Sequence, residues 1–383
     1  MKVNVYIWFV LFLGFVLIQD LNAQVVTDTL TNAEAQALKK RLDKQLSKSQ
    51  KKVAFQFLPI IYYTPETKLA LGASGVISFK LNSLDTVLEP SQITPSFVYT
   101  LNKQILAQVG YNLHLNRMWL LKGRIGYFVY PYFFAGVGNN HDGNYQEWYD
   151  AEYPLFSANL TRKIYKQSLS VGILYDFQNT KITSTSDSLL VGKSVSGSSG
   201  STQSALGFTT IWNTRDFDLS STKGWYANLS VQWVDPNLGA SYTDQIVRLD
   251  VRKYISLTKK KDVLALQLFS ETHHGDVPFN LMSMLGGSKL MRGYQRGVYR
   301  DRQMMVYQAE FRSRLLFNYF GFVLFGNYGA IGNNFDDLNK NYRYTYGAGI
   351  RFTPLPKKRY FIRLDYGKGQ NTQGFYIEVG EAF

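Results

Sequence analysis

The stretch GGSKLMRGYQRGVYRDRQMMVYQAEFRSRL, residues 286–315, decides how the rest of the chain is interpreted. Its first half holds four glycines around an arginine-rich core, and its second half contains Glu310 and Arg312, two charges separated by one residue. Glycine lets a backbone turn sharply and approach a wall closely. Residues two apart in a strand point to the same face. The stretch therefore predicts an arginine-bearing loop that runs into a strand with one charged face.

Apolar and polar residues alternate along most of the chain from Val53 onward. Between 105 and 115, for example, every odd position is apolar, while most even positions carry Gln, Gly, Asn or His. Successive side chains of a strand point to opposite faces, so one face suits lipid and the other a polar lumen. A soluble β-sandwich also alternates, but its strands are usually shorter and its outer face is polar. The pattern favours a membrane barrel.

Sixteen segments carry this strand pattern, and the loop of the decisive stretch falls between the eleventh and the twelfth. They are 53–63, 68–80, 92–101, 104–116, 118–130, 153–165, 167–179, 203–214, 225–235, 243–258, 262–274, 303–315, 321–332, 342–353, 359–368 and 373–383. The long connections 131–152, 180–202 and 275–302 all fall on one side, and mostly short turns fall on the other. That asymmetry is typical of outer-membrane barrels. We predict an all-β, transmembrane antiparallel barrel over 53–383, with both chain ends periplasmic.

Composition agrees with a barrel and narrows the function. Aromatic residues make up 15% of the chain, which suits girdles at two membrane surfaces. Cysteine is absent, so neither a disulfide nor a lipid-modified cysteine is expected. The net charge of +14 could attract anionic lipid or acidic partners. Nucleic acid is not an expected partner, because no recognition helix or basic-aromatic module is present. Two soluble domains are disfavoured, because no linker-like boundary follows residue 52.

The N-terminal segment predicts export. Residues 1–23 have a positive start, an apolar run and a small residue at the expected cleavage point, as in a signal peptide. A membrane-anchoring helix is the alternative, but the apolar run is short for a span of about 20 residues. Residues 24–52 predict a short basic periplasmic helix, with one narrow apolar stripe among lysines and arginines. That helix would lie on a membrane leaflet or the barrel mouth, or form a solvated linker.

The C-terminal segment predicts a final strand that carries an outer-membrane sorting signal. Apolar residues occur at every second position and end on an aromatic residue: Phe375, Ile377, Val379 and Phe383. Glu381 interrupts this alternation. A barrel pairs its last strand with its first, so a chain that ends within a strand fits closure without a free edge.

Several motifs resemble the BamA/TamA superfamily of outer-membrane assembly barrels (bacterial surface antigen type). Met291-Arg292-Gly293-Tyr294 resembles the (V/M)RG(F/Y) tip of that family's sixth loop, and Glu310-x-Arg312 resembles the pair on its next strand. The segment 212–225 is similar to the family's NxRD…G turn, and 343–369 is similar to its penultimate hairpin region. The turn residues are Asn213, Arg215, Asp216 and Gly224. The resemblance covers residues 200–383 by motif and 53–200 by strand pattern only.

The resemblance implies that the loop folds back into the lumen and that its arginine meets acidic groups there. Carried onto this chain, Arg292 is the arginine, and Glu310 and Asp365 are its candidate partners. Three other arginines compete for these carboxylates: Arg312, Arg351 and Arg363. Asn327 stands where the family often has Asp, which would shift or weaken the anchoring. The alternative is that these charges only line a wet lumen.

Chemistry at the four histidines is a weaker hypothesis. His273 and His274 are followed by Gly275-Asp276, which could suggest a protease or metal site. However, no HxSxG-like constellation and no metal-ligand spacing accompanies them. We expect no catalytic residues, no metal site, no cofactor and no enzymatic activity.

The expected function follows from the resemblance. It implies a barrel without POTRA domains that assists insertion or translocation of proteins, or of lipid, at the outer membrane of a Gram-negative-type cell. Expected partners are outer-membrane lipid, outer-membrane protein clients, and periplasmic proteins or lipoproteins. The alternative is a porin-like channel, or a surface-exposed binding barrel plugged by its sixth loop. The sequence does not indicate the client or the oligomeric state.

Overall fold

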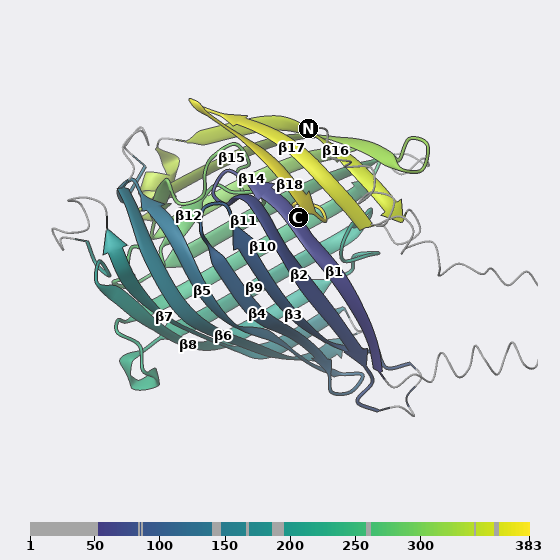
Figure 1. Cartoon of the computed structure of the whole chain (residues 1–383), viewed down its shortest axis with the longest axis horizontal. Coiled ribbons are helices and arrows are strands. Elements are labelled where there is room, and N and C mark those ends of the chain that lie inside the picture. The colour runs from purple at the N-terminus through teal and green to yellow at the C-terminus, as the bar shows by residue number, and fades with distance from the viewer. Residues whose placement is uncertain are drawn as a thin grey trace, which may run out of the picture. The chain divides into compact units, whose positions relative to one another are not determined.

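The computed structural model of the chain contains one closed barrel of sixteen antiparallel strands (Figure 1). The structure describes residues 53–82, 85, 87–139, 147–165, 168–185, 195–257, 262–340, 342–355 and 360–383. Neighbours around the barrel follow the chain order, except that β14 pairs with β11, because β12 and β13 form a separate two-stranded sheet. The predicted fold class and strand number are confirmed.

The barrel strands match the predicted segments closely through most of the chain. They are β1 (Val53–Thr64), β2 (Lys68–Phe79), β3 (Ser91–Thr100), β4 (Ile105–His114), β5 (Trp119–Phe134), β6 (Glu147–Tyr165), β7 (Leu169–Thr185), β8 (Gly200–Asn213), β9 (Gly224–Val234), β10 (Asp244–Ser256), β11 (Val263–His273), β14 (Gln303–Arg312), β15 (Phe320–Gly332), β16 (Arg343–Leu355), β17 (Tyr360–Gly369) and β18 (Thr372–Val379). The remaining elements are β12 (Ser283–Leu285), β13 (Tyr299–Asp301), and the 3-10 helices η2 (Pro236–Leu238) and η3 (Phe335–Asn339).

Strand alternation places apolar side chains on the outside of the barrel. In β15, Phe322 and Leu324 are exposed outward, whereas their neighbours Val323 and Phe325 are buried inside. Large exposed apolar side chains recur on almost every strand, which suits contact with hydrocarbon. No helix within the described residues is long and apolar enough to cross a membrane.

Three strands extend further than the sequence predicts. β5 ends at Phe134, β6 begins at Glu147 and β7 ends at Thr185. The connections in the structure are therefore shorter than the predicted 131–152 and 180–202. The predicted fifth strand ended one residue before Pro131, which cannot donate a ladder hydrogen bond. In the structure Pro131 lies opposite Asp150, where the register between β6 and β7 shifts, and pairing continues to Phe134.

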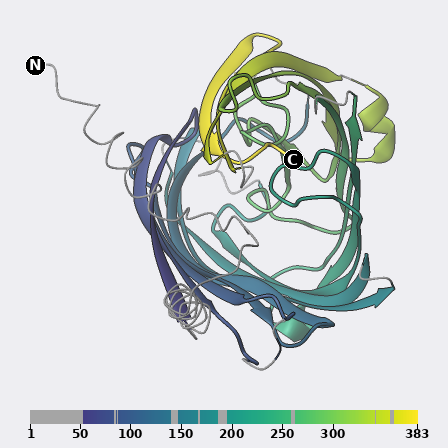
Figure 2. The same cartoon turned by 90° about the vertical axis from the view of Figure 1, so that its right-hand side faces the viewer.

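The predicted final strand, 373–383, is wrong at its end. β18 stops at Val379, and Gly380 has φ +89°, a backbone conformation that favours glycine. Beyond this bend Phe383 packs inside the barrel against Tyr254, Val263 and Ala265. Figure 2, which looks along the barrel, shows the C-terminal end of the chain inside the ring of strands.

The two ends of the barrel differ. We call the end that carries the connections β5–β6, β7–β8, β9–β10 and β11–β14 the loop end. The opposite end, where β1 begins, is the turn end. The predicted signal peptide (1–23) and basic helix (24–52) lie outside the described residues and remain predictions.

Candidate functional site

The connection between β11 and β14 is built to enter the lumen. We call residues 274–302 the lumen loop. Its hairpin, β12 and β13, pairs Leu285 with Tyr299 and closes off the tip that lies between them. Four glycines of the loop have positive φ values: Gly286, Gly287, Gly293 and Gly297. These glycines allow the turns that bring the tip to the barrel wall.

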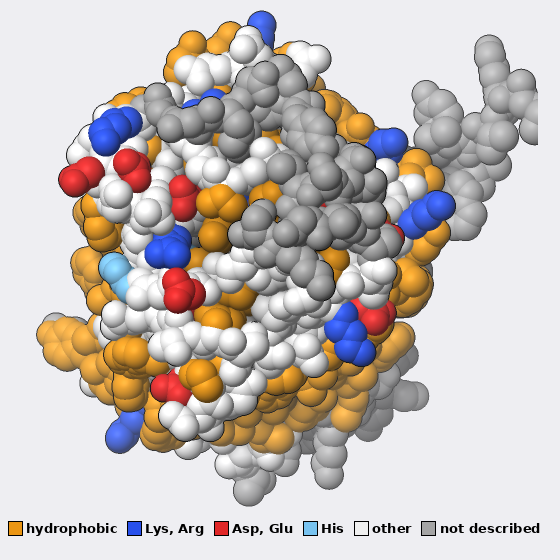
Figure 3. Space-filling view, turned by 90° about the vertical axis from the view of Figure 1, so that its left-hand side faces the viewer, with side chains coloured by type: hydrophobic (Ala, Val, Ile, Leu, Met, Phe, Trp, Pro, Cys, Tyr) orange, Lys and Arg blue, Asp and Glu red, His pale blue; other side chains and the backbone are white. Residues whose placement is uncertain are grey.

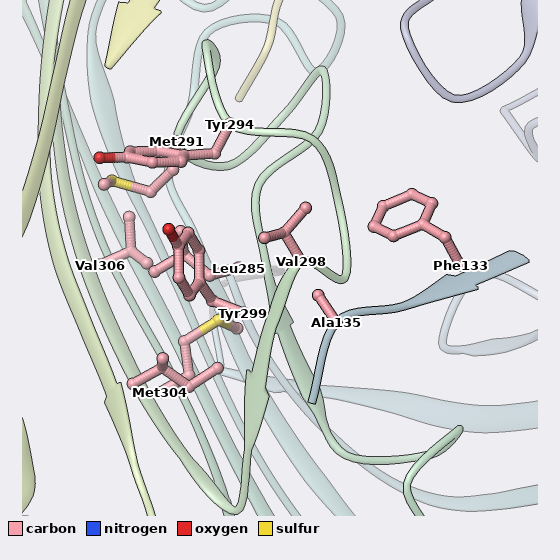
Figure 4. Packing of buried hydrophobic residues seen from close by; sticks show 10 residues of the cluster. Phe133, Ala135, Leu285, Met291, Tyr294, Val298, Tyr299, Met304 and Val306 are labelled. Atoms are coloured by element: carbon pink, nitrogen blue, oxygen red, sulfur yellow. The ribbon is translucent and has the colours of Figure 1, made fainter. Parts of the chain in front are cut away.

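A buried apolar cluster fixes the base of the tip. Figure 4 shows Met291 and Tyr294 from the tip beside Leu285 and Tyr299 from the hairpin, with Val306 and Met304 of β14 in the same cluster. Tyr294 and Tyr299 meet edge to face, with ring centroids 5.7 Å apart. Burying a side chain of this size contributes about 1.5–3 kcal/mol. The loop is therefore anchored by packing before its charges are considered.

Arg292 lies at the centre of a buried ionic cluster. Its Nη1 is 2.5 Å from Asp365 Oδ2, its Nη2 donates to Glu310, and all three side chains are fully buried. Its guanidinium carbon lies 3.7 Å from the centroid of the Phe325 ring. The structure thus brings Arg292 together with both acidic residues that the resemblance singled out.

The three competing arginines share the same carboxylates and bring in two further ones. Arg351 Nη1 lies 2.5 Å from Asp365 Oδ1, and Arg363 Nη1 lies 2.9 Å from Asp365 Oδ2. Arg312 pairs with Glu310 at 2.8 Å. Arg351 also binds Glu381 at 2.8 Å, and Arg363 also binds Glu378. Four arginines therefore face four carboxylates, so the cluster is neutral overall.

Backbone contacts hold the tip against β17 and β18. Gly293 N donates to Tyr376 Oη at 3.0 Å, and Thr372 Oγ1 donates to Gly293 O at 2.9 Å. A Cβ atom added to Gly367 would lie 2.6 Å from Arg292 O. Glycine at 367 is therefore what lets the loop backbone touch the strand.

A second contact connects the lumen loop to the other side of the barrel closure. Arg296 N donates to Glu66 Oε1 at 2.8 Å, and Glu66 belongs to the turn between β1 and β2. Asn102 Nδ2 donates to Glu66 O at 2.7 Å, which connects this turn to the turn between β3 and β4. The loop therefore touches β17 and β18 through residues 292–294 and the β1–β2 turn through Arg296.

The ladder between β1 and β18 is short. We call this boundary the seam. Tyr63 and Ile377 are the single pair of Cα partners across it among the described residues, whereas β17–β18 has eight pairs and β5–β6 has sixteen. Consistently, every residue from Val53 to Pro59 is exposed, on both faces of β1. Most of β1 thus has backbone groups without a strand partner on the seam side.

The remaining motif residues lie apart from the ionic cluster. Asn213 Oδ1 accepts from Arg215 N at 3.2 Å, and Asp216 Oδ1 accepts from Thr222 N at 2.8 Å, within the β8–β9 turn. Gly224 has φ +107°, and a Cβ there would lie 2.3 Å from Thr214 O. These four residues shape a turn. Asn327 is buried and donates to Thr345 Oγ1 at 2.6 Å, so a carboxylate at 327 is not needed to complete the cluster.

The terminal aromatic motif is divided between two environments. Phe375 and Val379 are exposed on the outer face of β18, and Ile377 is half-buried beside Tyr63. Phe383 lies in the lumen, where Arg312 Nη2 donates to its backbone oxygen at 2.8 Å.

Sequence reasoning missed several members of the site. Glu378, Glu381 and Tyr376 were not expected to contact the loop, although Glu381 gave a signal: a charge at an outward strand position indicates that the strand has ended. Arg300 was also missed. It is 1% exposed, forms no ion pair with a carboxylate of the described residues, and donates to Phe133 O and Gly297 O at 2.7 and 2.8 Å. It ties the hairpin of the lumen loop to β5.

His273 is buried, with Nδ1 2.6 Å from Asp244 Oδ2, while His274 lies at the loop end near Phe335. Among the described residues no group of three or more His, Cys, Asp or Glu side chains could hold a metal ion.

The fold and site define an outer-membrane β-barrel with a loop docked in its lumen by an arginine. The Omp85 superfamily domain matches residues 71–383, so the chain belongs to the Omp85 superfamily. This match confirms the expected resemblance to BamA/TamA-type barrels.

Solved structures show the same fold at low sequence identity. BamA from Haemophilus ducreyi lacking POTRA domains 1–3 has a TM-score of 0.61 at 14% identity, covering 94% of this chain and 80% of that one. CdiB from Acinetobacter baumannii has a TM-score of 0.52 at 12% identity, covering 89% and 68%. CdiB from Escherichia coli has a TM-score of 0.53 at 11% identity, covering 86% and 63%. No curated protein sequence matches the chain.

Proposed function

We propose that this barrel assists the insertion or translocation of proteins at the outer membrane, and that the client strand engages the seam between β1 and β18. The observation that carries the proposal is the single Cα pair, Tyr63 with Ile377, across that seam. An unpaired strand edge is a template for another strand. Within hydrocarbon its free donors and acceptors each cost several kcal/mol, so pairing with a client strand is favoured.

Two further features support a seam that opens and recloses. The bend at Gly380 removes residues 380–383 from the ladder. The turn-end half of β1 is therefore paired with β2 on one side and has no strand partner on the seam side. The lumen loop contacts both sides of the seam, through Tyr376 on β18 and Glu66 beyond β1. The loop can therefore hold the barrel together while the backbone ladder at the seam is broken. The proposed role requires no catalytic residue and no cofactor.

The proposal includes an orientation, with the turn end in the periplasm and the loop end at the cell surface. The absence of native cysteine makes this testable by single-cysteine labelling. A bulky maleimide should label Asn237→Cys, in η2 at the loop end, on intact cells. It should label Leu219→Cys, in the β8–β9 turn, only after the outer membrane is permeabilised. The opposite pattern would reverse the orientation.

Reconstitution tests the function itself. Liposomes that contain the chain should fold a urea-unfolded small outer-membrane barrel faster than liposomes that lack it. Their ionic conductance should be small and unsteady, because the lumen loop fills part of the barrel. A large, steady conductance with no acceleration of client folding would instead support the porin-like channel.

A further inference from the structure

The lumen contains a cavity that the proposed function does not use. Its volume is about 840 Å³, and its wall is formed by β4–β7 on one side and the lumen loop on the other. In Figure 2 the loop lies nearer the green and yellow strands than the blue ones. Ligand sites in proteins typically measure about 300–1,000 Å³. The cavity is thus of a size to enclose a small ligand.

One wall of this cavity is apolar at positions that face the lumen. Val98, Leu106, Phe128 and Tyr153 are Cα partners in turn across β3, β4, β5 and β6, so they form one row on one face. Their sequence neighbours Tyr127 and Pro154 are exposed on the outer face. Leu155 joins the same apolar cluster. Barrel interiors are ordinarily polar, so this row is not explained by contact with water.

The lumen loop lines the cavity with both polar and apolar side chains. The lumen loop contributes four aliphatic or thioether side chains that line the cavity: Leu281, Met282, Met284 and Leu290. Apolar side chains from β4–β6 and from the lumen loop therefore both line the space. Methionine adapts its shape to irregular partners, and such side chains are common at binding surfaces.

The charges around the cavity are unevenly satisfied. All four acidic residues that line it have partners: Glu66 with Arg296 N, Asp176 with Gln232, Glu271 with Arg248, and Glu378 with Arg363. Among the basic residues, Arg248 is paired, whereas the side chains of Arg124, Lys289 and Arg296 form no ion pair within the described residues. The partners of Glu66 and Asp176 are uncharged, so the four acidic and four basic side chains of the wall balance in charge, and Arg124 is a cation of the wall that forms no ion pair within the described residues.

The charged and apolar parts are arranged along the barrel axis. Arg124 precedes Phe128 by four residues on β5, which begins at the turn end, so its guanidinium lies on the turn-end side of the apolar row. Beyond the row, towards the loop end, Phe134, Tyr149 and Phe279 pack into a cluster in which each is at most 1% exposed. The apolar row therefore lies between Arg124 on the turn-end side and this cluster on the loop-end side.

We propose that this cavity binds an amphiphile with one hydrocarbon chain and an anionic head. The chain would lie along Leu106, Phe128 and Tyr153, and the carboxylate or phosphate of the head would be bound by Arg124. Burial of the CH₂ groups of such a chain is favourable, and a guanidinium can donate two parallel hydrogen bonds to such a head. A free fatty acid and a lysophospholipid both have this chemistry.

Binding of a fluorescent undecanoate to the purified full chain tests the proposal. Arg124→Ala should weaken this binding about 10- to 100-fold, as expected for loss of a hydrogen bond to a charged group. Lys122→Ala is the matched control, because Lys122 has the same charge on the same face of β5 but does not line the cavity. It should bind as the wild type does. Equal affinity of all three proteins would overturn the proposal.

A second experiment tests the orientation and does not depend on Arg124. An undecanoate with a maleimide at its far end should label Tyr130→Cys, which lies inside the cavity at the chain end. It should label Val129→Cys, its outward neighbour, much more slowly, and excess dodecanoate should block only the former reaction. Equal labelling that dodecanoate does not block would contradict the site. Native mass spectrometry of membrane-purified protein distinguishes the sources, because a fatty acid and a lysophospholipid add different masses.

Discussion

The β5–β6 ladder and the seam belong to the same barrel but are held together in different ways. β5 and β6 pair at sixteen positions, whereas β1 and β18 pair at one. β5 and β6 are held together by a full ladder of backbone hydrogen bonds. At the seam, closure depends on the lumen loop, which contacts β17 and β18 through Arg292 and Gly293 and the β1–β2 turn through Arg296. Cohesion at the seam is therefore carried by side chains within the lumen, which leaves the strand edge available.

The first prediction removes the strongest contact of the loop. Arg292→Ala leaves Glu310 and Asp365 short of one partner in a buried cluster, and breaking such a pair typically costs about 3–5 kcal/mol. We expect faster proteolysis within 286–302 while the barrel remains folded. Arg292→Lys should rescue poorly, since an ammonium cannot donate as a planar fork.

Arg302→Ala is the control for this prediction. Arg302 is in the same loop, but its partner Asp276 is 92% exposed, so the pair is worth about 0–1 kcal/mol. Unchanged cleavage in Arg292→Ala would mean that the ionic cluster does not hold the loop.

The second prediction separates the close backbone approach from the charges. Gly367→Ala places a Cβ 2.6 Å from Arg292 O and should destabilise the docked loop by about 1–3 kcal/mol, as overpacking does. Gly326→Ala is the control, because no atom lies within 4 Å of the added Cβ. Proteolysis of the loop should rise in the first variant and not in the second. Equal rates would show that the approach is not tight.

The third prediction tests the contact on the other side of the seam. Glu66→Ala removes the acceptor of Arg296 N. A hydrogen bond to a charged group contributes about 1.5–3 kcal/mol, and we expect a smaller contribution here because Glu66 is only half-buried. Amide hydrogen exchange of Tyr62 and Tyr63 should become faster. Glu89→Ala, which changes a carboxylate in the β2–β3 connection, should leave these amides unchanged. If both variants behave alike, the loop does not support β1.

The smallest expected effect lies in the β2–β3 connection. Arg117 donates to Asp85 at 2.6 and 2.7 Å, and these hydrogen bonds lower the pKa of the Asp85 carboxyl from 3.8 to about 2. The folded-state pKa lies below the unfolded one, so the contribution to stability is present above pH 4 and is lost as the pH falls towards 2.

We therefore expect Asp85→Asn to lower the denaturant midpoint slightly at pH 7, by an amount that shrinks below pH 4. Arg117→Ala should show the same pH dependence. If the difference in denaturant midpoint between Asp85→Asn and wild type stays constant with pH, the hydrogen bonds from Arg117 do not lower the pKa of Asp85.

The fold was predictable because strand period and aromatic content are local properties of the sequence. Strand ends were less predictable: the predicted fifth strand stopped at residue 130, whereas pairing continues to Phe134, past the register shift near Asp150. Arg292 and Asp365 could be paired only through the family resemblance, because 73 residues separate them. Glu378 points inward by the same alternation as Tyr376, but its contact with Arg363 was not expected, and Glu381 was missed because its direction depends on the bend at Gly380. The contact between Arg296 and Glu66 joins residues 230 apart through a backbone N–H, which carries no sequence signature.

A disulfide across the seam tests the central claim most directly. Cα partners in an antiparallel ladder lie about 4.5–5.5 Å apart, within the range that a disulfide bridges. Because the chain has no cysteine, Tyr63→Cys with Ile377→Cys can form only the intended bond. The control is Leu71→Cys with Tyr99→Cys, a pair across β2 and β3. In the liposome folding assay, oxidation should abolish the acceleration of client folding by the seam variant alone. Reduction should restore that acceleration. Equal client folding by the oxidised and reduced seam variant would contradict the account.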